Sequence, residues 1–138
     1  MGSKTVVIVE DEYETAEMLG EMMRLIGFQV FKSSGGRRAI DLIAEKKPTA
    51  VLLDQMMPEI SGLEMLSIIR KDSHLCHIPV IIISAKCLPS DQRLGLEAGA
   101  ACYLTKPVAF IDLKQAVEQA VTETSPFTSQ QNSGLLLH

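Results

Sequence analysis

Four apolar runs in the sequence end on side chains that could take part in chemistry. The first run ends in Glu10 and Asp11, and later runs end in Asp54, Ser84 and Lys106. Three carboxylates without His or Cys partners favour a hard divalent cation such as Mg²⁺. A cation and a lysine beside a carboxylate would neutralise charge on a transferring phosphoryl group. Because a carboxylate can itself attack phosphorus, this set predicts that Asp54 accepts a phosphoryl group.

These side chains can act together only if the apolar runs are neighbouring strands of one sheet. Strand-like runs alternate with amphipathic helices five times along the chain, at 5–9, 29–31, 50–53, 80–83 and 101–104. This alternation predicts an α/β fold, and five strands suit a parallel sheet of order 2-1-3-4-5 with helices on both faces. In that order the first, third, fourth and fifth strands lie side by side. Their carboxyl ends would then meet at one edge.

Start and stop signals define the helices between these strands. Gly27 suits the left-handed cap at the end of the first helix. Ser61 and Glu64 form a capping box that starts the third helix. Pro89 opens the fourth helix, which should stop at Gly99.

Composition limits the classes of protein that this chain can be. It has 138 residues, 46% hydrophobic and 22% charged, with a net charge of -4. This balance argues against direct nucleic-acid binding, and no run approaches the roughly 20 apolar residues that span a bilayer. Three cysteines without C-x-x-C spacing are interpreted as reduced cysteines that pack in the interior, so a cytoplasmic location is expected.

The expected organisation is one domain at 5–123. Residues 1–4 are interpreted as the start of the chain, with a cloning vector as one origin for Gly2 and Ser3. A polar, Gly- and Ser-rich segment at 124–138 is interpreted as a linker or mobile tail.

The side chains at the strand ends also lie in a familiar pattern of motifs. Over about residues 4 to 123 the chain resembles the response-regulator receiver domains of two-component signalling. The motifs that carry the resemblance are Glu10-Asp11-Glu12, Asp54-x-x-Met57-Pro58-x-x-x-Gly62, Ser84-Ala85 and Tyr103-x-x-Lys106-Pro107. The resemblance implies a flavodoxin-like fold and a signalling module rather than an enzyme with a separate substrate. It also implies self-catalysed, Mg²⁺-dependent phosphorylation and dephosphorylation.

The same resemblance assigns a role to each residue of the site. Asp54 would be the phosphoacceptor and a ligand of Mg²⁺. Asp11 would bind the metal directly, Glu10 would act mainly through metal-bound water, and the Met56 carbonyl oxygen would complete the protein ligands. Lys106 would contact the carboxylate and then the phosphoryl group.

A switch is implied beside this site. Ser84 would hydrogen-bond a phosphoryl oxygen, and Tyr103 would turn from exposed to buried in the space that Ser84 vacates. The Lys106-Pro107 peptide bond is expected to be cis. Without the resemblance, Tyr103 would be interpreted as an ordinary strand residue; its spacing of three residues before Lys106 favours the switch.

Partners follow from the resemblance as well. A sensor histidine kinase or a histidine phosphotransfer protein would supply the phosphoryl group. A downstream effector would bind the surface made by the fourth helix, the fifth strand and the fifth helix, without direct contact with nucleic acid or membrane. A weak homodimer stays open, but Ala100 and Ala101 lack the acidic residue of the dimers formed by winged-helix regulators.

Two departures from the family pattern affect the chemistry. Glu10 stands where the family more often has aspartate, which should alter the affinity for Mg²⁺. Met56, two residues after Asp54, cannot hydrogen-bond an attacking water, so the phosphoryl group on Asp54 should be long-lived.

Other residues have a structural and a functional interpretation. His74, Cys76 and His77 are expected in a solvated loop rather than in a metal site. The methionines of the first helix are expected to fill the core, although part of the group could face a partner; they are Met18, Met22 and Met23.

Two other classes of function remain as alternatives: an interaction module, and a true enzyme such as a flavoprotein or an aspartyl-phosphate hydrolase. A phosphorylation-independent interaction module of the same fold is disfavoured because Asp11, Asp54 and Lys106 are all present. A flavoprotein is disfavoured because Glu10-Asp11-Glu12 would repel a cofactor phosphate after the first strand. An aspartyl-phosphate hydrolase would need a cap insertion, and no loop is long enough to form one.

Overall fold

The structure is a computed structural model that describes residues 4–123. Within these residues five strands alternate with five helices. The strands are β1 (Thr5–Val9), β2 (Gln29–Ser33), β3 (Ala50–Leu53), β4 (Val80–Ser84) and β5 (Cys102–Thr105). The helices are α1 (Tyr13–Ile26), α2 (Gly36–Lys46), α3 (Gly62–Lys71), α4 (Pro89–Glu97) and α5 (Phe110–Glu123). The predicted tail at 124–138 and residues 1–3 lie outside the described residues.

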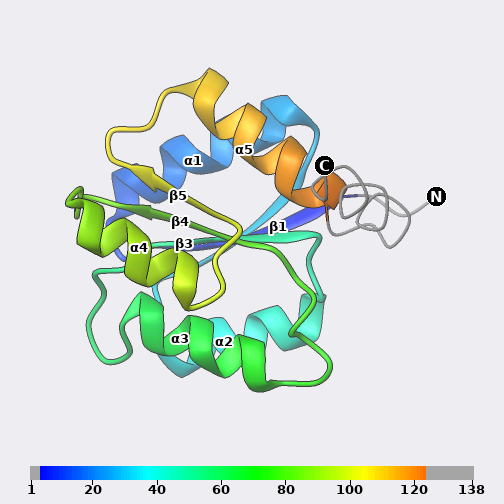
Figure 1. Cartoon of the computed structure of the whole chain (residues 1–138). Helices are drawn as coiled ribbons and strands as arrows, with labels where there is room; N and C mark the ends of the chain where they lie inside the picture. Colours follow the sequence, from blue (N-terminus) through cyan, green and yellow to red (C-terminus); the bar gives the residue numbers. More distant parts are fainter. Residues whose placement is uncertain (1–3, 124–138) are drawn as a thin grey trace, which may run out of the picture.

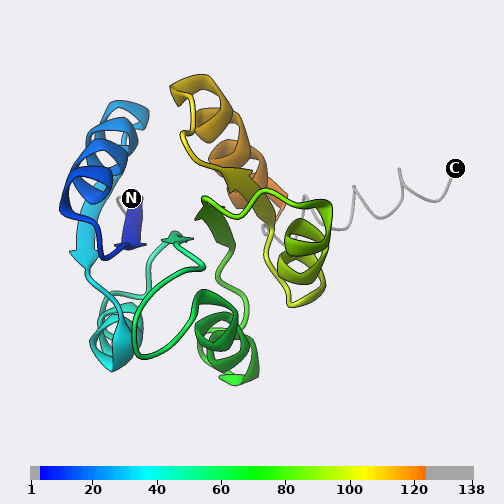
Figure 2. The same cartoon turned by 90° about the vertical axis from the view of Figure 1, so that its left-hand side faces the viewer.

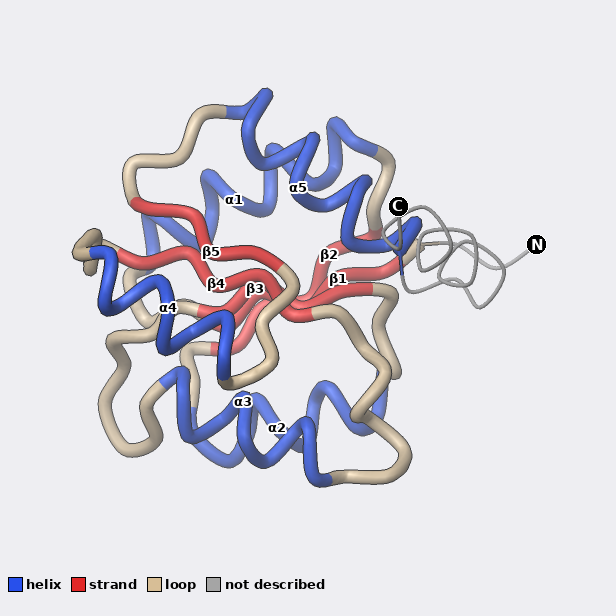
Figure 3. The backbone as a smooth tube through the Cα atoms, in the orientation of Figure 1, coloured by secondary structure: helices blue, strands red, loops and turns tan. Residues whose placement is uncertain are grey.

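The strands form one parallel sheet in the order β2-β1-β3-β4-β5. Helices α1 and α5 cover one face, and α2, α3 and α4 cover the other (Figures 1 and 2). Figure 3 shows the sheet as the middle of three layers. The predicted flavodoxin-like (βα)5 sandwich with strand order 2-1-3-4-5 is confirmed.

The sequences of the strands follow their places in the sheet. Strands β3 and β4 are buried at every position because helices cover both faces. The edge strand β2 is only half-buried, and it continues past the predicted end at Phe31 to Ser33. Lys32 and Ser33 are polar, so hydrophobic pattern alone missed them; pairing with Ile8 and Val9 of β1 holds them in the strand.

The predicted helix caps occur in the structure. Gly27 has a φ of 111°, and its amide donates to the carbonyls of Met23 and Arg24. The Ser61 side chain accepts from the Glu64 amide at 3.2 Å, and the Glu64 carboxylate accepts from the Ser61 amide at 2.9 Å. Each of these contacts satisfies a backbone group that a helix end leaves unpaired.

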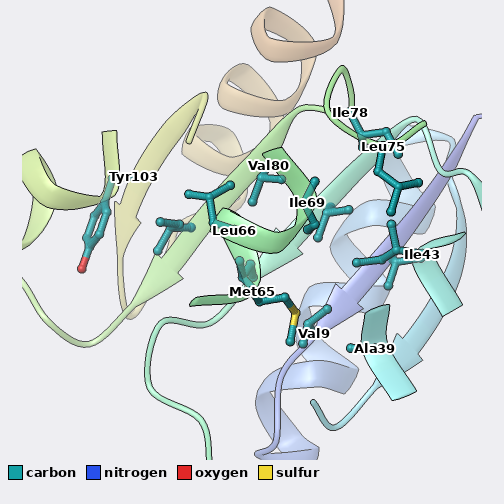
Figure 4. Packing of buried hydrophobic residues seen from close by; sticks show 14 residues of the cluster. Val9, Ala39, Ile43, Met65, Leu66, Ile69, Leu75, Ile78, Val80 and Tyr103 are labelled. Carbon is teal, nitrogen blue, oxygen red and sulfur yellow. The ribbon is translucent and has the colours of Figure 1, made fainter. Parts of the chain in front are cut away.

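Two apolar clusters hold the helices to the sheet. One lies under α1 and α5 and includes Met23, Leu113 and Val117. The other lies under α2 and α3, and Figure 4 shows it with Tyr103 at one end. The methionine prediction holds for Met23, which is fully buried, but is wrong for Met18, which is 41% exposed. The periodicity of α1 could not separate its core face from the adjoining surface.

The loop before β4 agrees with its prediction, whereas two of the cysteines do not. Cys76 and Cys87 are exposed, so the prediction that the cysteines pack in the interior is wrong for both. His74 and His77 are exposed in the loop before β4, as predicted. Over residues 4–123 no helix combines the length and apolar character that crossing a membrane would need.

Gly62, the first residue of α3, lies against the backbone that carries Asp54. A Cβ added to Gly62 would come within 2.6 Å of the Asp54 carbonyl oxygen and of the Gln55 Cα. The Gly62 amide also donates to the Gln55 carbonyl at 3.0 Å. The start of α3 therefore fixes the backbone after β3.

We predict that Gly62→Ala destabilises the fold by about 1–3 kcal/mol, because the added methyl group must displace backbone rather than a flexible side chain. Urea unfolding measures the change. Gly20→Ala is the matched control, since an added Cβ there has its nearest neighbours at 3.6 Å. This control should gain up to about 1 kcal/mol from helix propensity. Equal stability of the two variants would contradict the account.

Candidate functional site

The register of the sheet brings the predicted side chains together at one edge. Val9 pairs with Leu53, so Glu10 and Asp54 follow neighbouring strand ends. The Asp54 amide donates to the Val9 carbonyl at 3.0 Å, and the Lys106 amide donates to the Ser84 carbonyl at 2.9 Å. Main-chain hydrogen bonds thus continue past the strands into the site and fix the side chains that follow.

Lys106 is the cation of this edge. Its Nζ lies 2.8 Å from Glu10 Oε1 and 3.3 Å from Asp54 Oδ2. The predicted contact with Asp54 is present, but the contact with Glu10 is shorter and was not predicted. The peptide bond between Lys106 and Pro107 is cis, as predicted.

Backbone donors hold the two buried carboxylates. The Met56 amide donates to Asp54 Oδ1 at 3.1 Å, and the Glu12 amide donates to Glu10 Oε2 at 3.2 Å. Asp54 is 5% exposed and Glu10 is 4% exposed. These bonds orient one oxygen of each carboxylate and leave the other toward Lys106.

One ammonium does not balance the carboxylates. Oxygens of Glu10, Asp11 and Asp54, called here the acidic cluster, lie within 4.8 Å of one another. Burial raises the pKa of Glu10; the Lys106 ammonium opposes this shift and the charge of Asp54 adds to it. Burial alone would lower the pKa of Lys106, but Glu10 and Asp54 outweigh it and raise that pKa.

Glu10 carries a buried oxygen whose hydrogen bonding is incomplete. Besides the contact with Lys106 at 2.8 Å, Glu10 Oε1 accepts no other hydrogen bond within residues 4–123. A buried carboxylate oxygen with a single partner has a lone pair left for a second cation or a water. An all-oxygen set with such an atom fits a hard divalent cation.

Ser84 and Tyr103 lie beside the acidic cluster. Ser84 is fully buried, and its Oγ accepts from the Lys86 amide at 3.2 Å. Tyr103 is 8% exposed, and burial raises the pKa of its hydroxyl. The predicted starting position of Tyr103, exposed to solvent, is therefore not the one observed: the ring already lies inward. Strand spacing could place this residue but not choose its side-chain rotamer.

The fold and the site agree with a known family of proteins. The family model of the response regulator receiver domain matches residues 6–118 of the chain. The chain belongs to this family.

Relatives of this receiver domain occur both alone and in longer proteins. The phosphate regulon transcriptional regulatory protein PhoB of Pseudomonas aeruginosa is 32% identical, over 99% of this chain and 61% of PhoB. The polar-differentiation response regulator DivK of Brucella anthropi is 32% identical, over 77% of this chain and 86% of DivK. The solved receiver domain of Francisella response regulator 1452 has a TM-score of 0.81 at 28% identity, over 88% of this chain and 99% of that one. The chain thus spans less than two thirds of the length of PhoB.

Gln55 is a site residue of this receiver domain that sequence reasoning missed. It follows Asp54 directly, is 6% exposed, and meets the Tyr103 hydroxyl at 2.7 Å. Its position in the family motif is unrestricted, so the resemblance gave it no role. The one available signal was a second polar residue, directly after Asp54, at the end of a strand of four apolar residues.

The raised pKa of Glu10 predicts a pH-dependent stability in the absence of divalent cations. The contribution of this carboxyl to the free energy of unfolding is largest below the ordinary value of 4.5 and falls as the pH rises through the raised folded-state pKa. Glu10→Gln removes this fall. At neutral pH and without divalent cations, the variant should therefore unfold at a higher urea concentration than the parent, and the gap should close in acid.

The control for this prediction is Glu97→Gln, which neutralises an exposed carboxylate at the end of α4. Its urea midpoint should follow that of the parent at each pH. A Glu10→Gln variant that is less stable than the parent at neutral pH would mean that the ion pair with Lys106 outweighs the cost of burial.

Proposed function

We propose that this receiver domain is a phosphoacceptor switch in which Asp54 takes a phosphoryl group from a histidine kinase or a histidine phosphotransfer protein. The observation that carries the proposal is the position of Lys106, whose ammonium lies 3.3 Å from Asp54 and 2.8 Å from Glu10. A lone strand-end aspartate would need no such partner.

The transfer needs a nucleophile, a charge partner and a hydrogen-bond donor. An oxygen of Asp54 attacks phosphorus as the bond from phosphorus to the donor group breaks, which gives an acyl phosphate on Asp54. The Met56 amide holds Oδ1, while Lys106 faces Oδ2 and can follow the negative charge onto the phosphoryl oxygens. The Ser84 hydroxyl supplies a further hydrogen bond. The module thus promotes its own phosphorylation and dephosphorylation rather than the turnover of a separate substrate.

The acidic cluster is proposed to hold Mg²⁺ through Glu10, Asp11 and Asp54, with the Met56 carbonyl oxygen as a further ligand. A bound Mg²⁺ would neutralise charge on the phosphoryl oxygens. The fit rests on the hard oxygen donors and on the incomplete hydrogen bonding of Glu10 Oε1.

We propose that a downstream effector binds the surface formed by α4, β5 and α5. A groove of about 430 Å³ lies there, lined by Gln92 on α4, Tyr103 and Leu104 on β5, and Ala116 and Gln119 on α5. Because Tyr103 connects this groove to the site, a change at Asp54 can alter the surface that an effector meets. The predicted cytoplasmic location belongs to the same proposal, since cytoplasmic kinase domains would supply the phosphoryl group.

The test is the intact mass of the protein after incubation with Mg²⁺ and a small acyl-phosphate donor. The parent should gain one phosphoryl group, and the gain should need Mg²⁺. Asp54→Asn should gain none, because the amide is not a nucleophile of comparable strength.

A matched control keeps the result specific. Asp41→Asn changes an exposed aspartate on α2 and should gain the group as the parent does. No gain in the parent, in the presence of Mg²⁺ that the protein binds, would overturn the proposal in favour of the phosphorylation-independent module.

The side chain of Met56 predicts a slow loss of the phosphoryl group. It is 52% exposed at the mouth of the site and has no group that could orient an attacking water. Met56→Asn should speed hydrolysis by roughly 3- to 30-fold, below the factor of about 100 that a well-placed acid or base contributes. The decay of the phosphorylated mass with time measures the rate. Met56→Leu is the apolar control. Equal hydrolysis rates for Met56→Asn and Met56→Leu would contradict the role of the Met56 side chain in slowing hydrolysis.

A further inference from the structure

The hydroxyl of Tyr103 is held on two sides inside the protein. Its Oη lies 2.7 Å from Gln55 Oε1 and 2.9 Å from the carbonyl oxygen of Lys86. Gln55 and Tyr103 are 6% and 8% exposed. The ring is thus tied at once to the residue after Asp54 and to the loop between β4 and α4.

The chemistry of the hydroxyl decides how these bonds are arranged. A phenol has one proton, and a carbonyl oxygen can only accept, so Tyr103 cannot donate fully to both neighbours. The oxygen and nitrogen of a glutamine amide exchange places by a half-turn of the amide. With its amide turned, Gln55 donates through Nε2 to the Tyr103 oxygen while Tyr103 donates to Lys86. All three groups are then satisfied.

Helix α4 leaves space for the ring in this position. A Cβ added to Gly95 would come within 2.7 Å of Tyr103 Cδ2 and 3.0 Å of Ile82 Cδ1. Glycine inside a helix is unfavourable by about 1 kcal/mol relative to alanine. The ring packs against the α4 backbone because position 95 has no side chain.

Gln55 is in turn fixed by the site itself. It directly follows Asp54, and its carbonyl accepts from the Gly62 amide at 3.0 Å. The side chain that reaches Tyr103 therefore starts from a backbone position that is set together with that of Asp54. Figure 4 shows the Tyr103 hydroxyl directed away from the labelled aliphatic side chains of the cluster.

We propose that Gln55 is a positioning residue that holds Tyr103 inward through its hydrogen bond and so couples the Asp54 backbone directly to the α4-β5-α5 surface. As a consequence, Tyr103 lies inward before phosphoryl transfer. The significance for signalling rests on the proposed function; the hydrogen bond and its effect on Tyr103 do not.

The test is ¹⁹F NMR of protein labelled with 3-fluorotyrosine, without a phosphoryl donor or Mg²⁺. The chain has two tyrosines, and Tyr13 is 75% exposed, so a Tyr13→Phe background leaves Tyr103 as the one labelled ring. The parent should give a line with a small H₂O-to-D₂O shift, as expected for a buried ring. Gln55→Met keeps the length of the side chain but removes the hydrogen bond.

In Gln55→Met the ratio of inward to outward ring should fall by about 2- to 12-fold, as expected for the net loss of one hydrogen bond. In the spectrum of Gln55→Met, this change in population should appear as exchange broadening of the Tyr103 line and as a larger H₂O-to-D₂O shift than in the parent. Gln55→Asn, whose amide is one methylene shorter, is a second variant that should show the same change if Gln55→Met does not fold. Lines in both variants that keep the position, width and solvent shift of the parent would overturn the proposal.

Two further arms separate this inference from its alternatives. Gly95→Ala should displace the ring without touching Gln55, and the line it gives identifies the outward position. Addition of Mg²⁺ and an acyl-phosphate donor should return the Gln55→Met line toward the inward position and leave the parent line in place. If Gln55→Met alters the line but the donor has no effect on it, the positioning role stands and the phosphoacceptor function fails.

Discussion

The structure depends on an imbalance of charge at one edge of its sheet. Three carboxylates of the acidic cluster come within 4.8 Å of one another, and Lys106 is the ammonium that contacts two of them. Burial strengthens both the attraction and the repulsion. The raised pKa of Glu10 reflects the cost, since the ionised form is held less well in the folded protein than in water. Buried charge clusters of this kind gather at functional sites.

The fold sustains this cluster through backbone contacts rather than through side chains alone. Parallel pairing of β1 with β3 and of β4 with β5 sets Glu10 beside Asp54 and Ser84 beside Thr105. Gly62 lets α3 begin directly against the Asp54 backbone, and Gly95 lets α4 lie on the ring of Tyr103. Because Gly62 and Gly95 have no side chains, α3 and α4 pack closely against the Asp54 backbone and the Tyr103 ring. These close contacts connect the acidic cluster to the surface formed by α4, β5 and α5.

Sequence reasoning could predict the sheet order and the residues at its carboxyl edge. The hydrophobic periodicity of the sequence indicates the strands and helices, and the carboxyl ends of parallel strands lie at the same edge of the sheet. It could not predict contacts made by rotamers. The inward ring of Tyr103, the short contact between Glu10 and Lys106, and the role of Gln55 depend on how side chains pack from separate elements. Met18 shows the same limit, since helical spacing alone does not mark where the buried face of α1 ends.

The central claim is that Asp54, and not another carboxylate of the acidic cluster, receives the phosphoryl group. The most direct measurement is borohydride reduction of the phosphorylated protein followed by peptide mapping, because reduction converts an aspartyl phosphate into homoserine at the modified position. The account predicts homoserine at position 54 alone, in an amount that follows the phosphorylated fraction. Reduction products at Glu10 or Asp11, or at no carboxylate of the cluster, would contradict it.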